Sequence, residues 1–494
     1  MGARYRSVRS EGDEVVMAGA LTQFGRRLKA ATIAFRSYEG AGAGRRWRGV
    51  SAITHQGAAM TAARGPIGRR ARALVGNVAI AASARDAWVN NLIGAGIKPQ
   101  SQHPNPTVRA QINAAFDRWT DQADFDRIAD FYGLQAIAAG RMVVEGECFA
   151  MPTMDGTEGN PLRIRLFDAE QVDPQRFEIL KNNSGRVVAG IEFDAAGRRT
   201  AYHVYRERPE FNYWGSLATV RISADHMLQV FRPEMPGQVR GLSWFAPVLL
   251  SLNDVDQLAD AQIMRQKVAA LLTGFIVNQN GDAGPFAGDP SSDGSAIDSG
   301  LEPGSLKVLA AGQDVRFSDP ATIGAESIDF LRLIVRHIAA GLGVPYEILT
   351  GDLSQVNFSS IRAGLLEFRR RVETIQNNVV IFQFCRPIWE RWLTIAALSG
   401  EVDARGFARD PRAFLAAKWI TPRKEFVDPL KDARAEIEAI NAGITSRREA
   451  VAARGWDIEQ LDVEIAADHE RAKRLGLQFG VPSSPIDPAN EASQ

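Results

Sequence analysis

The most constraining stretch of the sequence lies between Ile328 and Leu398, because two helical patterns there flank a short connection. The first pattern stops at Gly343-Val-Pro345, where glycine favours the end of a helix and proline opposes its continuation. The second starts at Ser359-Ser360 and carries apolar residues about every 3.6 positions, the period of one helix face. We therefore expect a loop over residues 346–358, held in place by two helices.

Two long helices are predicted. The helix that begins near Ser359 spans roughly 40 Å up to Arg386, with a kink at Pro387 and an end at Gly400. An earlier helix runs from an N-cap at Ser243 to about Leu272, which is roughly 45 Å. Helices of this length are typical of a bundle or a stalk.

Shorter segments surround these helices. A single helix is predicted over 67–92, and residues 401–480 are again helical, with a helix start at Trp419-Ile-Thr-Pro422. Residues 147–231 alternate apolar and polar side chains, which indicates a sheet. Further strands are expected near the low-apolar insert 278–304, at Gly274–Val277, Ser305–Ala310 and Asp314–Phe317. The fold class is therefore α+β and mostly helical.

Composition narrows the function little. The chain has 494 residues and equal numbers of basic and acidic side chains, 58 of each, so the net charge neither indicates nor excludes a nucleic-acid partner. Residues 1–75 hold 14 Lys and Arg against 4 Asp and Glu, which predicts an arm that binds phosphates or an acidic neighbour, or one that is merely solvated. The two cysteines suggest buried thiols, and no apolar run is long enough to cross a membrane.

The sequence lacks the common patterns of a reactive site. Its six histidines are scattered, and two cysteines cannot form a pair of zinc-binding CxxC motifs. It contains no GxxxxGK[ST] phosphate loop and no GxSxG elbow. Asp352 is interpreted as a turn residue that binds nearby amides. We predict no catalytic residue, no metal and no cofactor.

One alternative remains open at this point. Glu145, Glu147 and Asp168 fall near the predicted edges of strands, where a metal-dependent nuclease could use three carboxylates. The simpler interpretation is that they are ordinary surface and turn residues.

Three stretches together resemble the lambda-type family of tailed-bacteriophage portal proteins: Arg232–Ser243, Gly343–Asp352 and Val356–Ala363. Supporting matches are Asn90-Asn91 before Gly94-Ala-Gly96, the pair Gly146-Glu147, and the segment Pro387–Trp392. The resemblance covers about residues 65–400. Phe358 stands where the family often has tyrosine.

The resemblance implies a homo-oligomeric ring, usually of twelve copies, at one vertex of the virion capsid and assembled in the host cytoplasm. Double-stranded DNA passes through its channel without sequence specificity during packaging and ejection. The implied partners are the terminase large subunit, a head–tail connector or adaptor and the major capsid protein, with no membrane. The main alternative is another minor capsid or connector protein.

The resemblance also divides the chain into regions. They are a basic N-terminal arm (1–66), an α+β wing (67–240), a stem helix (241–273), a clip with a mobile insert (274–322), a second stem helix (323–345), a tunnel loop (346–358), a long wing helix (359–400), a helical crown (401–480) and a disordered tail (481–494).

The tunnel loop is the predicted functional site. From Asp352 to Phe358 it contains no Lys or Arg, which suits a surface that DNA slides past. The DNA-channel residues are predicted to be Ser354, Gln355, Val356, Asn357 and Phe358. Arg265 and Lys267 in the first stem helix are weaker channel candidates, because they could instead form pairs between subunits.

Overall fold

The computed structural model describes residues 55–155, 159–209, 218–270, 274–278, 313–317, 325–354, 358–423 and 428–477. The chain divides into two units, residues 1–59 and residues 60–494. Most of the predicted arm, the predicted strand at 305–310 and the predicted tail lie outside the described residues. Within the described part, no helix is both long and apolar enough to span a bilayer.

The predicted helix over 67–92 is two helices, α2 (Gln56–Asn77) and α3 (Ala79–Leu92). Val78 separates them in an extended conformation, with φ −110° and ψ 117°. The Asn77 side chain donates to the Ala73 carbonyl at 2.7 Å, so it satisfies an acceptor of the last turn of α2. α2 begins before residue 67, which places residues 56–66 of the predicted arm in a helix.

A three-stranded antiparallel sheet lies at the centre of the predicted wing, in the order β3-β2-β9. Its strands are β2 (Glu147–Met154), β3 (Leu162–Phe167) and β9 (Leu228–Phe231). Two helices precede it in the chain, α4 (Pro106–Thr120) and α5 (Phe131–Glu145). The three strands confirm the sheet predicted from the alternation of apolar and polar residues over 147–231.

A second antiparallel sheet has the order β4-β5-β6-β7-β8. Its strands are β4 (Glu178–Ile179), β5 (Gly185–Val188), β6 (Ile191–Asp194), β7 (Arg199–Tyr205) and β8 (Thr219–Ser223). It has its own small core, which includes Phe149 of β2 with its ring 5.7 Å from that of Tyr202. The two sheets therefore share a layer of buried side chains.

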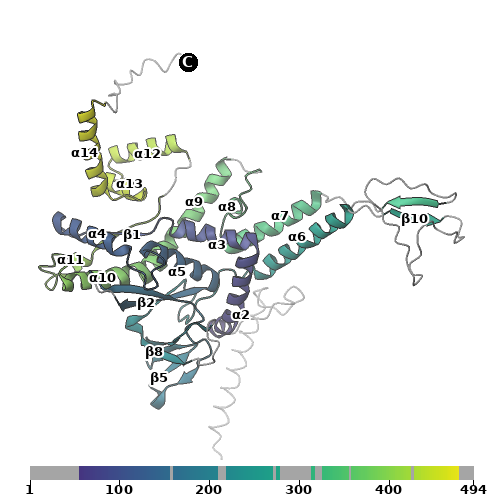
Figure 1. Cartoon of the computed structure of the whole chain (residues 1–494), viewed down its shortest axis with the longest axis horizontal. Helices are drawn as coiled ribbons and strands as arrows, with labels where there is room; N and C mark the ends of the chain where they lie inside the picture. Colours follow the sequence, from purple (N-terminus) through teal and green to yellow (C-terminus); the bar gives the residue numbers. More distant parts are fainter. Residues whose placement is uncertain are drawn as a thin grey trace, which may run out of the picture. The chain divides into compact units, whose positions relative to one another are not determined.

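The two predicted stem helices are α6 (Leu249–Ala270) and α7 (Ala325–Leu342), which lie side by side in Figure 1. Between them the chain forms an antiparallel pair of strands, β10 (Gly274–Asn278) and β11 (Gln313–Phe317). The helix start predicted at Ser243 is wrong, because turns occupy residues 244–248 and the helix begins at Leu249. The Ser243 hydroxyl accepts from the Phe245 amide at 3.2 Å, so it caps the turn that precedes the helix. Pro247 contributes to this delay, since it supplies no amide donor.

The long helix has three parts: α9 (Phe358–Ile375), a π-helical segment η6 (Gln376–Cys385) and α10 (Arg386–Ser399). The wider turns end where Pro387 enters the helix. Because proline has no N–H, the regular i→i−4 ladder is interrupted there, and the Arg386 amide instead reaches the Ile381 carbonyl five residues back. Gly400 ends the helix with φ +77°, as predicted.

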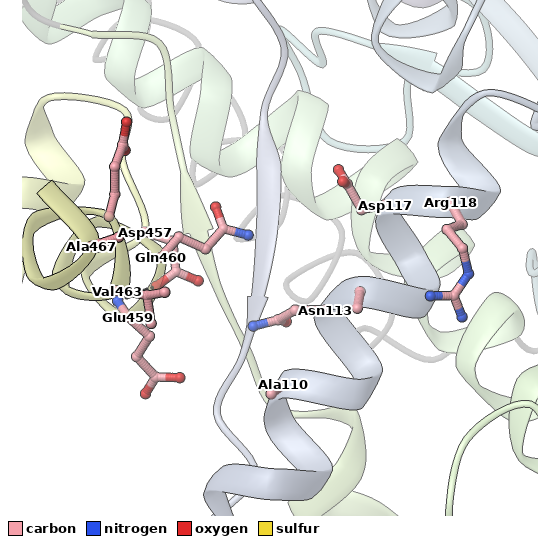
Figure 2. Close-up of a pocket in the computed structure, with 11 residues that line it drawn as sticks. Ala110, Asn113, Asp117, Arg118, Asp457, Glu459, Gln460, Val463 and Ala467 are labelled. Carbon is pink, nitrogen blue, oxygen red and sulfur yellow. Dashed lines mark hydrogen bonds between the residues drawn. The ribbon is translucent and has the colours of Figure 1, made fainter. Parts of the chain in front are cut away.

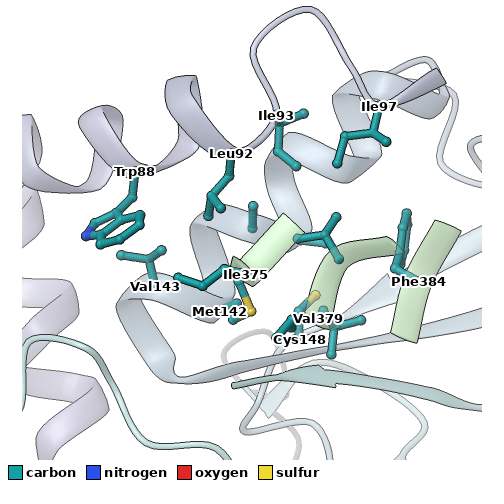
Figure 3. Packing of buried hydrophobic residues seen from close by; sticks show 14 of the residues in the cluster. Trp88, Leu92, Ile93, Ile97, Met142, Val143, Cys148, Ile375, Val379 and Phe384 are labelled. Carbon is teal, nitrogen blue, oxygen red and sulfur yellow. The ribbon is translucent and has the colours of Figure 1, made fainter. Parts of the chain in front are cut away.

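Side chains of this long helix form much of the main core. Ile375, Val379 and Phe384 pack near Trp88 and Leu92 of α3, Met142 and Val143 of α5, and Cys148 of β2 (Figure 3). Two glutamines of η6 tie it to its neighbours. The side-chain amide of Gln376 donates to the backbone carbonyl of Leu92 at 2.8 Å. The side-chain oxygen of Gln383 accepts from the backbone N–H of Phe231 at 2.9 Å.

The C-terminal part is helical except for one strand. Its elements are α11 (Pro411–Leu415), β12 (Ala417–Ile420), α12 (Pro429–Asn441), α13 (Arg447–Ala453) and α14 (Ile458–Leu475). The helix start predicted at Trp419-Ile-Thr-Pro422 is wrong: Trp419 and Ile420 belong to β12, which pairs antiparallel with β1 (Lys98–Ser101), and the next helix begins at Pro429 with Asp428 as its N-cap.

A buried ion cluster joins three distant segments. Glu147 is fully buried, and its Oε1 accepts from Arg240 Nε at 2.7 Å and from Arg64 Nη2 at 2.9 Å. Its Oε2 accepts from Gln229 at 2.8 Å and from the Gly241 amide at 2.9 Å. Burial alone would raise the pKa of Glu147, but the two guanidinium groups outweigh that effect and hold the pKa below its usual range.

The glycines beside these residues allow the close approach. A Cβ atom on Gly241 would lie 2.1 Å from the Gly146 carbonyl oxygen, and one on Gly146 would lie 2.3 Å from the backbone of Leu242. The two short motifs Gly146-Glu147 and Arg240-Gly241 therefore meet, backbone to backbone, around one ion pair.

We expect the substitution Glu147→Gln to destabilise the wing by about 3–5 kcal/mol, because it leaves Arg64 and Arg240 buried without a countercharge. Urea unfolding followed by tryptophan fluorescence measures this. Glu178→Gln is the control, since the Arg176–Glu178 pair is exposed and worth less than about 1 kcal/mol. Equal losses in the two variants would contradict the assignment.

The same cluster predicts a dependence on pH. The pKa of Glu147 is lower in the folded than in the unfolded protein, so its stabilising effect is complete above the unfolded value of about 4.3 and is lost as the pH falls through the folded pKa. Below about pH 4, stability should therefore decline less steeply in Glu147→Gln than in the unsubstituted chain. Parallel declines would contradict this.

Candidate functional site

The predicted tunnel loop follows directly from α7. Gly343 takes φ +71°, and Pro345 precedes a short helix, α8 (Tyr346–Thr350), that ends at Gly351, also with φ +71°. The prediction of a loop over 346–358 is therefore wrong for its first five residues. Leu349 accounts for the difference, because the short helix buries that side chain in the main core.

Asp352 forms a compact turn after α8. Its Oδ1 accepts from the amide of Ser354 at 3.0 Å and from the hydroxyl of Ser354 at 2.6 Å. The Tyr346 hydroxyl donates to Oδ2 at 3.2 Å. The bonds from Ser354, foremost that of its hydroxyl, lower the pKa of Asp352. These contacts confirm that Asp352 is a turn residue.

Three side-chain donors fix the chain that leads into the loop. The indole N–H of Trp88 donates to the Leu342 carbonyl at 3.1 Å, and the Ser83 hydroxyl donates to the Leu349 carbonyl at 2.7 Å. Arg371 of α9 donates to the Gly343 carbonyl at 2.9 Å. Both ends of the connection are thereby held against α3 and α9. No sequence period marks these donors, because each acts across the fold.

The predicted channel residues are only partly described. Ser354 is exposed and lies in the Asp352 turn. Gln355, Val356 and Asn357 lie outside the described residues, and Phe358 is described only as the first residue of α9. Their role in a channel stays a prediction.

The structure does not bring Arg265 and Lys267 to this loop. A Cβ atom on Gly341 of α7 would lie 2.4 Å from Val248, just before α6, so the end of α7 that leads to the loop meets the start of α6. Arg265 follows at roughly 24 Å along α6, at about 1.5 Å per residue. Both side chains are exposed there.

The three carboxylates of the alternative nuclease site, Glu145, Glu147 and Asp168, all form ion pairs with arginines. Arg141 binds Glu145 at 2.6 Å and Asp168 at 2.7 Å, and Glu147 belongs to the separate buried cluster. Burial raises the pKa of Glu145. In the part of the chain that the structure describes, no group of three or more His, Cys, Asp or Glu could hold a metal ion. This geometry favours structural roles for the three carboxylates.

Two glycines with the same backbone angle permit a controlled test of the loop's base. Both substitutions place an alanine in the left-handed backbone conformation, at φ +71°, which costs about 1–2 kcal/mol of stability in either variant. Gly343→Ala should nevertheless lower the stability more than Gly351→Ala. A Cβ at 343 would lie 2.1 Å from Nη1 of Arg371, so this flexible side chain would move away and give up its hydrogen bond to the Gly343 carbonyl, whereas a Cβ at 351 meets nothing within 4 Å.

Thermal unfolding of the two variants gives the difference. The excess cost of Gly343→Ala should shrink when Arg371→Ala is added, because the clash and the hydrogen bond are then both absent. Identical losses in the two single variants would refute a special contact at Gly343.

The comparisons with known proteins agree with the motifs. The family model described as phage portal protein, lambda family, matches residues 43–376, which is more than half of the chain. The probable portal protein of Halomonas phage phiHAP-1 is 26% identical over 380 residues, which cover 75% of this chain and 72% of that protein. Portal protein B of Escherichia phage lambda is 24% identical over 372 residues and 67% of each chain.

Among solved structures, a chain from the neck of an empty gene transfer agent particle is 14% identical, with a TM-score of 0.45 and coverage of 85% of this chain and 94% of that one. The match of the family model and the two sequence relatives agree with the order of motifs along the chain. This chain belongs to the lambda family of phage portal proteins.

Proposed function

We propose that the chain forms a closed ring of about twelve copies at one vertex of the virion capsid, with a central channel through which double-stranded DNA enters during packaging and leaves at ejection. Membership of the portal family over residues 43–376 carries this proposal. The wing (67–240) and the long wing helix (359–400) then form the body of each subunit.

The loop that follows α8 is proposed to face the DNA. Its residues from Leu353 to Asn357 carry no charge. At the start of the loop, Asp352 is held in place by hydrogen bonds that it accepts from Ser354 and Tyr346. Each phosphate contact would add salt-dependent affinity, and strong binding would oppose movement of the duplex. An uncharged loop repeated around the ring therefore suits transport rather than readout of bases.

We propose that the clip binds other proteins and that the crown faces the capsid interior. The clip (274–322), which includes β10 and β11, is where the terminase large subunit and then a head–tail connector would bind. The helical crown (401–480) would lie inside the capsid, and the major capsid protein would surround the ring. Assembly would take place in the host cytoplasm.

Electron microscopy of the purified protein tests the proposal. We expect rings with rotational symmetry, an open axial channel, and Gln355 to Phe358 within about 15 Å of the axis at its narrowest level, which is the space that B-DNA and side chains require. A symmetric assembly without a channel would instead indicate another minor capsid or connector protein. Loops farther from the axis would contradict the assignment of the site.

Added charge in the loop should impair transport. The double variant Gln355→Lys with Asn357→Lys adds two positive charges to each loop. Each new phosphate contact should make the slope of log affinity for DNA against log salt concentration more negative by about 0.9. We expect tighter, salt-sensitive binding of duplex DNA to the ring and less DNA protected from nuclease in packaging assays with terminase. The control Gln355→Ser with Asn357→Ser should package normally. Unchanged binding and packaging in the lysine variant would refute contact with DNA.

A further inference from the structure

The three C-terminal helices bury almost none of their apolar surface. Among the described residues 428–477, the buried side chains are three alanines, Ala450, Ala452 and Ala472. The larger apolar residues are exposed, with Leu430 at 64%, Ile437 at 58% and Val463 at 72%. An amphipathic helix gains stability mainly by burying its apolar face, so these helices lack part of their packing within one chain.

One of the exposed surfaces is a groove between α4 and α14 of about 670 Å³ (Figure 2). Small or apolar residues of both helices line it, including Ala110, Ala114, Val463 and Ala467. The charged residues that line it are four carboxylates and one arginine: Asp117, Asp457, Glu459, Glu464 and Arg118. Within the chain, Asp457 already binds Gln100 and Glu459 binds Arg109. The ion pair between Arg109 and Glu459 at 2.5 Å fixes the two helices to each other. The groove is therefore a built feature of the chain.

The other surface is the exposed face of α12. Leu430 and Ile437 are seven residues apart and lie on one side of the helix, with the cationic Arg434 between them. On a different side of α12, Asp432 binds Arg362 at 3.1 Å and Glu436 binds Arg454. These two pairs attach α12 to its own chain and leave the apolar, cationic face outward.

We propose that the groove between α4 and α14 receives the Leu430–Ile437 face of α12 from a neighbouring copy of this chain. The two surfaces are complementary, since an apolar ridge with one arginine would meet a partly apolar groove in which four carboxylates outnumber the single arginine, Arg118. They are also different surfaces of the same chain. A contact between unlike surfaces is heterologous, and its repetition gives a ring when the rotation between neighbouring copies closes on itself, and an open filament otherwise.

This inference rests on the proposed ring and adds a specific contact to it. In each subunit, α12 would bind the groove of the next, so every copy would both donate a helix and accept one. Arg434 would then lie near Asp117 or Glu464 of the neighbouring copy. The C-terminal helices would reach their full packing only in the assembled ring.

Cysteine cross-linking of the full chain tests the contact. The double variant Ile437→Cys with Val463→Cys places thiols on the two surfaces, at exposed positions where substitution should not disturb folding. Cys148 and Cys385 are buried and should stay unreactive. With a short bismaleimide, we expect a ladder of covalently joined copies on a denaturing gel. The matched control, Ile437→Cys with Ile465→Cys, uses the same turn of α14 outside the groove and should give no ladder.

The outcomes are distinct. Rings in micrographs without a ladder would overturn this contact and leave the proposed function intact. A link confined to single chains would show that α12 fills its own groove, which also overturns the inference. A protein that never forms rings would overturn both the proposed function and this contact.

Discussion

The ion cluster around Glu147 is the constraint on which the arrangement of the chain depends. A carboxylate this deeply buried is tolerated only with partners, and its two guanidinium groups come from α2 and from the segment just before α6. Arg240 also donates to the carbonyls of Ala189 at 2.5 Å and Ala169 at 2.6 Å, so it joins the second sheet to the first. The strand β2, which carries Glu147, thereby fixes where the first stem helix starts.

Aromatic contacts connect the start of the first stem helix to the base of the loop. The Trp88 ring lies 4.8 Å from that of Trp244, near the start of α6, and 5.2 Å from that of Phe368 in α9. Its indole N–H is bonded to the end of α7. One buried side chain thus contacts both helices that flank the loop and the segment leading into α6.

Features with a local signature could be predicted from the sequence, and features that arise from distant contacts could not. The period of α9, the alternation of the strands over 147–231, and the glycine that ends α10 are visible along the chain. The helix α8 is too short to show a period, and it forms because Leu349 finds a buried site. Likewise, β12 exists because β1 lies beside it. The place of the loop follows from Gly343 and Pro345, whereas its anchors Ser83 and Arg371 depend on the tertiary fold.

Burial is unevenly distributed along the chain, and this bears on how a ring would assemble. The wing, the long wing helix and the adjoining ends of α6 and α7 share one large core, yet α6 has no buried side chain among residues 256–267 and α7 has none among residues 327–334. The C-terminal helices share this deficit. Apolar burial is the main favourable term in folding, so a single chain would stabilise its wing and the base of the loop first. In the proposed ring, the stem and crown would gain their packing from neighbouring copies, and the loop's base would already be in place when the channel closes.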